Sequence, residues 1–180
     1  MASWIVHLRI VEKLLNKIDI LDPPQFAVGN IAPDSGIPDE KWENFNPPGE
    51  VTHFMIPNGN PWRCADLDFY RRYLQDIRQQ DNIKRFSFLL GYFFHLLADN
   101  LWHEKIALPT QVKYAIEFEN DSDFVWEVKR DWYGLDFIYV RDHPNSLFYQ
   151  IFLNCEYVEN YLDFMPIEAV QQRISYIKEY

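Results

Sequence analysis

The sequence predicts an all-α protein, a multi-helix bundle with one long ordered loop rich in proline and glycine. Two observations lead to this prediction: apolar residues recur at helical spacing outside residues 22–61, and prolines and glycines are concentrated within that segment. Hydrophobic residues make up 48% of the chain and aromatic residues 17%. This composition excludes intrinsic disorder. At 180 residues the chain fits a single domain spanning 1–180.

The N-terminal segment has the pattern of an amphipathic helix over residues 4–18, and Ser3 stands where a residue can cap it. Residues 22–61 differ, because repeated prolines and glycines exclude a long helix or a regular sheet there. The apolar residues in this segment, Phe26 and Trp42 among them, favour an ordered loop over a disordered tail.

Helical periodicity returns after this loop. It predicts helices over 66–78, 83–101, 110–119, 123–135, 146–162 and 166–179. The segment 83–101 is apolar nearly all round, which indicates a central buried helix. Pro109 can start the helix that follows it, and residues 142–144 mark a break before the last two.

The charge balance limits the class of partner. Seventeen Lys and Arg residues against 27 Asp and Glu residues give a net charge of -10. This balance argues against stable nucleic-acid binding and against adsorption to an anionic membrane. A small phosphate ester or lipid head group stays compatible with it, because bound metal ions supply positive charge locally.

The cysteines and the N-terminus indicate the compartment. Cys64 and Cys155 are too few for a disulfide framework or a thiolate zinc site, so we expect two buried free thiols. The N-terminus does not have the pattern of a signal peptide, and the longest apolar stretch, 86–101, is too short and too polar for a transmembrane segment. We therefore expect a cytoplasmic protein.

The clearest chemical signal lies on the predicted helix 83–101 and just beyond it. A spacing of four residues puts His95, Asp99 and His103 on one helix face. Imidazole and carboxylate groups on adjacent turns can bind one metal ion, and a carboxylate on an apolar helix is costly to bury without a partner or a cation. The alternative is a core histidine that hydrogen-bonds the carboxylate.

Three more residues could complete a metal site. His7 lies on the apolar face of the first helix, Asp34 in the ordered-looking segment 28–36, and His53 between apolar neighbours after several prolines. Each also has an ordinary interpretation: His7 as a core residue, Asp34 as a turn or cap residue, and His53 as a surface histidine. As a set, they occupy the first helix, the long loop and the buried helix in that order.

This order resembles the zinc-dependent phospholipase C family of bacteria, which shares its helical fold with fungal single-strand nucleases. The resemblance covers roughly the first 105 residues, and the matching positions are His7, Asp34, His53, His95 and Asp99. The resemblance implies one zinc ion bound by the last four of these residues. It also implies a neighbouring ion reached by His7, with Asp99 bridging.

Two departures from the family pattern reduce the expected number of ions. The mature secreted enzymes begin with a tryptophan whose amino group binds metal, whereas Trp4 follows three other residues. The family's His-x-x-x-Glu pair is absent, because Leu147 stands four residues after His143. The substitutes that the sequence offers are His103, Glu127, Asp131 and Asp136. We therefore expect one or two zinc ions.

The resemblance implies a zinc-dependent hydrolase of phosphate esters in which metal-activated water attacks phosphorus. Asp34 is the candidate to orient that water or to act as general base. Aromatic residues of the loop could shape a pocket for an apolar group or could belong to the core; these are Trp42, Phe45, Phe54 and Trp62.

Two other functions compete with this one. The first is a catalytically reduced metal-binding protein of the same fold, with a structural or binding role. The second is a metal-dependent phosphohydrolase of the HD class, which ranks last because the chain has no His-Asp dipeptide.

Overall fold

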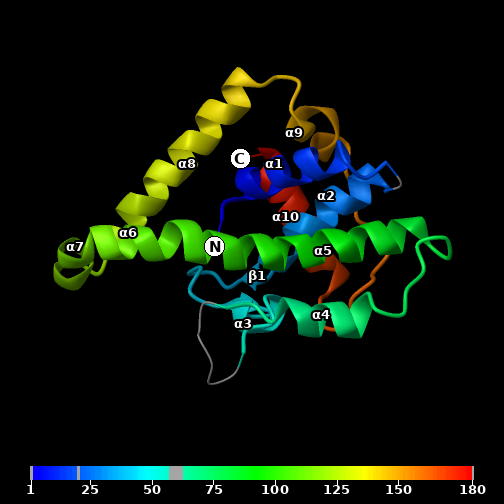
Figure 1. The fold of residues 1–180 in the computed structure, drawn as a ribbon, viewed down its shortest axis with the longest axis horizontal. Coiled ribbons are helices and arrows are strands. Elements are labelled where there is room, and N and C mark those ends of the chain that lie inside the picture. The colour runs from blue at the N-terminus through cyan, green and yellow to red at the C-terminus, as the bar shows by residue number, and fades with distance from the viewer. Residues whose placement is uncertain (1, 20, 57–62, 180) are drawn as a thin grey trace.

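Helix α5 (Ile83–Trp102) runs through the middle of the molecule, and the other elements are arranged around it (Figure 1). The computed structural model describes residues 2–19, 21–56 and 63–179. The longer helices besides α5 are α1 (Trp4–Leu15), α2 (Pro23–Ile31), α4 (Asp66–Tyr73), α8 (Phe124–Asp142) and α10 (Ile167–Glu179). The predicted all-α class is confirmed.

Shorter elements connect these helices. They are η1 (Ala32–Asp34), α3 (Gly49–Thr52), the π-helical turn η2 (His103–Ala107), α6 (Leu108–Lys113), α7 (Ala115–Asn120), α9 (Leu147–Gln150) and η3 (Phe152–Asn154). Strands β1 (Ile37–Pro38) and β2 (Phe45–Asn46) pair antiparallel, with Ile37 opposite Asn46.

Helix α2 corrects the prediction of a continuous loop over residues 22–61. Pro23 and Pro24 occupy the first turn, where the backbone N–H groups have no helical partner, so the prolines start the helix rather than prevent it. Asp22 caps that turn by accepting the Gln25 N–H at 3.0 Å. The rest of the helix, residues 26–31, is fully buried.

Helices α2 and α5 pack backbone against backbone. A Cβ atom on Gly29 would lie 2.0 Å from the Phe88 carbonyl oxygen, and one on Gly91 would lie 2.2 Å from the Phe26 carbonyl oxygen. The Asn30 side chain strengthens this interface by donating to the Gly91 carbonyl at 2.8 Å. Only glycine permits this approach at either position.

The prediction of a helix over 146–162 is wrong for most of its length. After α9 and η3 the chain is irregular up to α10. The Asn160 side chain accepts the Leu162 N–H at 3.1 Å and donates to the Met165 carbonyl at 2.9 Å. These bonds compete with helical ones, and Tyr157 is drawn into the core, where its ring stacks 5.0 Å from Phe88.

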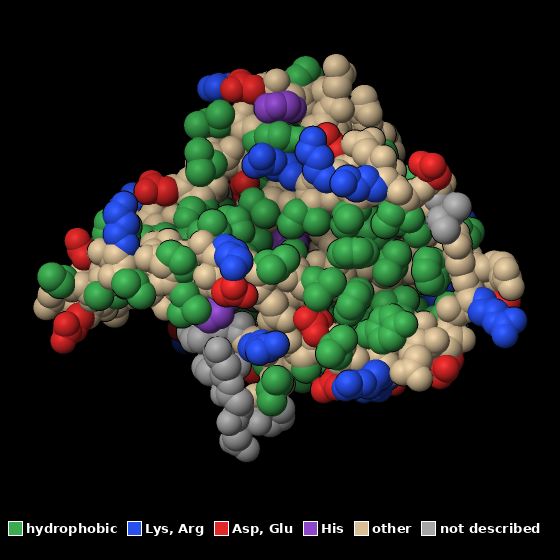
Figure 2. Space-filling view, viewed as in Figure 1, with side chains coloured by type: hydrophobic (Ala, Val, Ile, Leu, Met, Phe, Trp, Pro, Cys, Tyr) green, Lys and Arg blue, Asp and Glu red, His purple; other side chains and the backbone are tan. Residues whose placement is uncertain are grey.

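Helix α5 is not buried all round, contrary to the sequence-based expectation. Phe86, Leu90, Phe93 and Phe94 are only partly buried, and hydrophobic side chains gather over the middle of the face in Figure 2. In the part of the chain that the structure describes, no helix combines the length and the apolar character needed to cross a membrane.

Residues 103–142 form an arm, comprising η2, α6, α7 and α8. Helix α8 is the last element of this arm and leads from the α7 end back toward α9 (Figure 1). Several of its apolar side chains stay in solvent, with Val112 78% exposed, Ile116 72% and Leu135 62%. Asp136 is the buried residue of α8.

Candidate metal centre

Five side chains from α1, η1, α5 and the residue after α3 meet in the interior. His7, His95 and Asp99 form one group of potential ligands, and Asp34, His53 and His95 form another, with the ligand atoms of each group within 4.8 Å of one another. His95 belongs to both. The structure therefore brings together all five residues that the sequence singled out.

Each of two histidines is oriented by a backbone carbonyl. His95 Nδ1 lies 2.7 Å from the Asn30 carbonyl oxygen, and His53 Nδ1 lies 3.1 Å from that of Gly49. Because a carbonyl only accepts, we assign the ring proton to Nδ1 in both, which leaves the Nε2 lone pairs directed into the cluster. Such outer contacts fix metal-ligating imidazoles.

The two Nε2 atoms face each other at 3.3 Å. His95 Nε2 is 3.4 Å from Asp99 Oδ2, and His53 Nε2 is 3.3 Å from Asp34 Oδ1. Two lone pairs and two carboxylates at this separation repel unless a proton or a metal cation lies among them. Imidazole and carboxylate ligands of this kind fit zinc.

The ionisation states of the aspartates and histidines in the cluster depend strongly on one another. Burial opposes ionisation of Asp34, yet the contact with the His53 ring, and then the charge of His95, lowers its pKa to about 2. Burial likewise opposes ionisation of Asp99, but the charge of His95 holds its pKa well below the usual value. Burial alone would lower the pKa of His95, and the Asp99 carboxylate outweighs it and raises that pKa. Both carboxylates are therefore anionic near neutral pH.

His7 adds a third imidazole. Its ring stacks on His95 with centroids 3.8 Å apart, and Nε2 lies 3.5 Å from Asp99 Oδ1. Burial, and then the charge of His95, lowers the pKa of His7. Neither ring nitrogen of His7, nor Asp99 Oδ2, has a hydrogen-bond partner among the described residues. Buried polar atoms left without partners fit a cation site better than a satisfied core.

The N-terminal segment reaches this cluster at Ala2. The Ala2 N–H donates to Asp99 Oδ1 at 2.8 Å, in a buried position. Trp4, the counterpart of the tryptophan whose amino group binds metal in the secreted enzymes, is the first residue of α1.

The proposed substitutes for the missing His-x-x-x-Glu pair do not join the cluster. Neither potential-ligand group in the described residues contains His103, Glu127, Asp131, Asp136 or His143. Glu127, Asp131 and His143 are exposed, and His143 Nδ1 is 2.8 Å from the Tyr139 carbonyl on its own helix. His103 keeps the helical register, since its N–H donates to the Asp99 carbonyl, but it lies at the start of the π-helical turn and is only half-buried.

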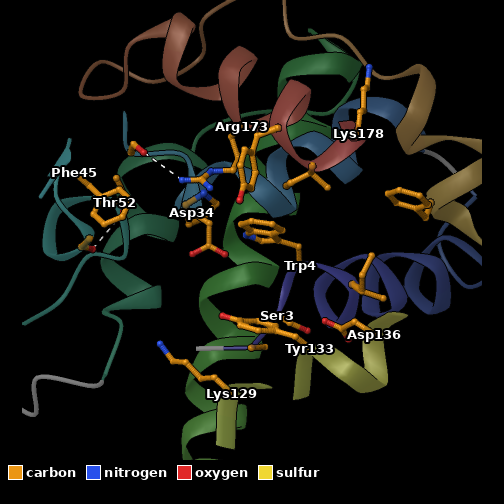
Figure 3. Close-up of a pocket in the computed structure, with 18 of the residues that line it drawn as sticks. Ser3, Trp4, Asp34, Phe45, Thr52, Lys129, Tyr133, Asp136, Arg173 and Lys178 are labelled. Carbon is orange, nitrogen blue, oxygen red and sulfur yellow. Dashed lines mark hydrogen bonds between the residues drawn. The ribbon is translucent and has the colours of Figure 1, made fainter. Parts of the chain in front are cut away.

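A cavity of about 690 Å³ lies against the cluster, and Asp34 and His53 form part of its wall. Figure 3 shows Asp34, Trp4 and Lys129 around it. Trp42 and Phe45 also line it, as the pocket hypothesis requires. Phe54 does not, because it packs edge-on against Phe69 with centroids 5.3 Å apart. Trp62 lies outside the described residues.

Sequence reasoning missed two residues that matter here. Asn30 carries the carbonyl that orients His95, and it was assigned to a loop. Arg173 lies in the apolar stripe of α10 between Val170 and Ile177 and is buried against the cavity. A cation at a core position of an amphipathic helix is the signal that could have revealed it.

Comparison with known proteins agrees with this geometry. Residues 6–179 match the family described as zinc dependent phospholipase C, which is nearly the whole chain. The chain belongs to the zinc-dependent phospholipase C family. No match was found among curated proteins, and none among solved structures. Zinc is accordingly the cofactor that the buried cluster of this phospholipase C family member fits.

Proposed function

We propose that this protein is a zinc-dependent hydrolase of phosphate esters, including phosphodiesters of the phospholipase C type. One observation carries the proposal: two imidazole Nε2 atoms face each other at 3.3 Å between two carboxylates, beside a cavity of about 690 Å³. The family match supports a phosphate-ester substrate.

The proposed ligands are His7, Asp34, His53, His95 and Asp99. Asp34, His53, His95 and Asp99 would hold one zinc ion, and His7 would reach a second, with Asp99 shared between them. We propose one or two ions, because the described residues outside these five contribute no further group to the cluster.

Zinc supplies Lewis acidity toward phosphoryl oxygens and makes hydroxide available near neutral pH. Asp34 stands where ligands and cavity meet. A carboxylate with a pKa of about 2 is a weak base, so its depressed pKa favours holding metal and orienting water over general-base catalysis. The Asn30 and Gly49 carbonyls favour the tautomer of His95 and His53 whose Nε2 atom faces the cluster.

The alternative is a metal-binding protein with reduced catalysis. The absence of further ligands from His103, Glu127 and His143 favours it. Against it, Asp34 and His53 border the cavity, whereas a purely structural zinc site is closed by protein ligands. An accessible ligand edge suits a site that admits substrate.

Metal content and hydrolysis test the proposal together. Zinc is measured in the purified protein by elemental analysis, and turnover is measured with bis(p-nitrophenyl) phosphate. We expect at least one zinc per chain, turnover lost on chelation, and a lower melting temperature after chelation because zinc binds the folded state. One tightly held ion without turnover would favour the alternative, and no metal after reconstitution would contradict both.

The domain organisation, the partners and the cellular location of the protein are also part of the proposal. We propose that residues 1–180 act as one domain, that nucleic acid is not a stable partner, and that the protein works in the cytoplasm. Two buried free thiols, Cys64 and Cys155, support a reducing compartment.

A further inference from the structure

The charged lining of the cavity beside the cluster does not share the strong negative charge of the whole chain. Its charged lining residues are Asp34, Lys129, Asp136, Arg173 and Lys178. The Lys178 amino group donates to the Cys155 carbonyl at 2.7 Å, so Lys129 and Arg173 are the two cations that balance the two carboxylates, although the protein carries a net charge of -10. Zinc held by Asp34 would offset one of the two carboxylates. The lining consequently favours an anionic ligand.

Arg173 is the cation in this lining that would gain most from an anionic ligand. It is only 7% exposed, and none of the ion pairs in the described part of the chain includes it. One of its amino groups donates to the Gly36 carbonyl at 3.3 Å, while the buried Nε–H has no hydrogen-bond partner among the described residues. Burial lowers the pKa of Arg173 even though the charge of Asp34 opposes the shift, so the attraction of Asp34 does not fully offset the cost of burying this cation. A bound anion would offset more of that cost.

The surroundings of Arg173 discriminate against cationic ligands. Its guanidinium lies 5.3 Å from the ring centre of Trp4 and 5.7 Å from that of Tyr176. Aromatic faces of this kind could hold a quaternary ammonium group, but here they already contact a cation. A second cation beside the guanidinium would be repelled.

A second cation faces the same space from the arm. Figure 3 shows Lys129 of α8 and Arg173 of α10 with Asp34 between them in that view. The Lys129 amino group lies 4.5 Å from the centre of the Trp126 ring, and Trp126 also lines the cavity. Cations and aromatic rings thus line the same cavity, whose volume of about 690 Å³ is large enough for the apolar part of an amphiphile.

We infer that Arg173 binds anionic oxygens of the substrate, and that the cavity selects amphiphilic phosphate esters of net negative charge over those with a quaternary ammonium head. This inference rests on the proposed function, because it names the substrate class of the same site. Arg173 offers planar paired donors that suit phosphoryl oxygens. In this inference, the role of Arg173 is to determine which substrates bind.

Two probes with the same chain and opposite charge test the inference. Octylphosphonate and octyltrimethylammonium are titrated calorimetrically into protein of measured zinc content, using wild type, Arg173→Met, Arg173→Lys and Arg72→Met. Arg72 is the matched control, since it contacts the Tyr73 ring at 5.1 Å but does not line the cavity. The affinity ratio of the two probes is compared, because this ratio cancels any general loosening of the cavity.

We expect wild type and Arg72→Met to prefer octylphosphonate. Arg173→Met should weaken phosphonate binding roughly tenfold to a hundredfold and raise the relative affinity for the ammonium probe. Arg173→Lys should fall between them, because it keeps the charge but loses the paired donors. An unchanged ratio in Arg173→Met, or a wild-type preference for the ammonium probe, would overturn the inference.

Two further measurements distinguish the inference from binding of phosphate alone and from the proposed function. Inorganic phosphate that binds as tightly as octylphosphonate would overturn the amphiphile part of the inference. Hydrolysis of dihexanoyl phosphatidylglycerol and dihexanoyl phosphatidylcholine is compared by kcat/KM, and we expect wild type and Arg72→Met, but not Arg173→Met, to prefer the anionic lipid. Failure to hydrolyse either lipid, with the phosphonate preference intact, would count against the proposed function alone. Zinc-dependent hydrolysis without preference would count against the inference alone.

Discussion

The α2–α5 interface and the arm of residues 103–142 place polar side chains in opposite surroundings. At the interface two glycines let the helices touch, and His95 and Asp99 are almost fully buried. On the arm, Glu127 and Asp131 lie one turn apart in solvent. Both regions show carboxylates or histidines at helical spacing in the sequence. Tight packing, rather than spacing, makes a ligand group out of one pair and a solvated face out of the other.

The arm nevertheless serves the site indirectly. Lys129, Tyr133 and Asp136 of α8 line the cavity. Burial raises the pKa of Asp136, although Ser3 and Arg9 oppose the shift. The interface thus supplies the proposed metal ligands, and the arm supplies part of the wall that a substrate would meet.

The largest effect on zinc binding and hydrolysis is expected from removal of His95, which lies at the α2–α5 interface. His95→Ala removes the imidazole that both ligand groups share, so we expect loss of stoichiometric zinc and a fall in hydrolysis of roughly a hundredfold or more. His143→Ala, at the exposed residue that follows α8, is the control and should keep both zinc and hydrolysis. Elemental analysis and phosphodiester turnover measure the two effects. Equal behaviour of the two variants would contradict the ligand assignment.

Alanine at two glycines should change stability in opposite directions. Gly91→Ala drives a Cβ into the Phe26 carbonyl and should cost about 1–3 kcal/mol of unfolding free energy or more. Gly134→Ala in α8 meets no atom within 4 Å and should gain about 0.5–1 kcal/mol, because alanine favours helix. Denaturant unfolding of both variants measures the difference. If Gly91→Ala left the free energy of unfolding unchanged, helices α2 and α5 would be able to move apart at little cost.

Zinc affinity should rise with pH. The raised pKa of His95 means that the metal-free cluster keeps a proton there above the ordinary histidine range, and zinc must displace it. Asp34 and Asp99, with lowered pKa values, are already ionised, and His7, with a lowered pKa, is already neutral. One proton released predicts about tenfold in affinity per pH unit below the pKa of His95. Competition with a chelator between about pH 6 and 8 measures this slope; a flat profile would contradict it.

The smallest effect is expected from the acidic pair on the arm. Glu127→Gln and Asp131→Asn should leave zinc content unchanged and stability within about 0.5 kcal/mol, since both side chains are exposed. Elemental analysis and unfolding curves of the double variant give the comparison. Loss of a zinc ion would show that the arm completes a second site.

Local signals account for the elements that could be predicted. Ser3 and the apolar repeat define α1, and the long apolar run around His95 defines α5, because helix periodicity and capping act within a few residues. The prolines of α2 misled the prediction, since their effect depends on position in the helix. The segment after η3 misled it too, because Asn160 satisfies backbone groups that a helix would use.

The sequence by itself determined the helical class, because helix periodicity is a local property of the chain. It also supplied the five residues that meet in the cluster, through the order in which they match the family pattern. Tertiary structure alone decided that Asn30 and Gly49 orient the imidazoles and that His103 and His143 stay outside. It also decided that Arg173 and Lys129 face one cavity. These arrangements depend on contacts between residues far apart in the chain, which form only when α2 closes on α5 and α8 folds back, and no local pattern encodes that approach.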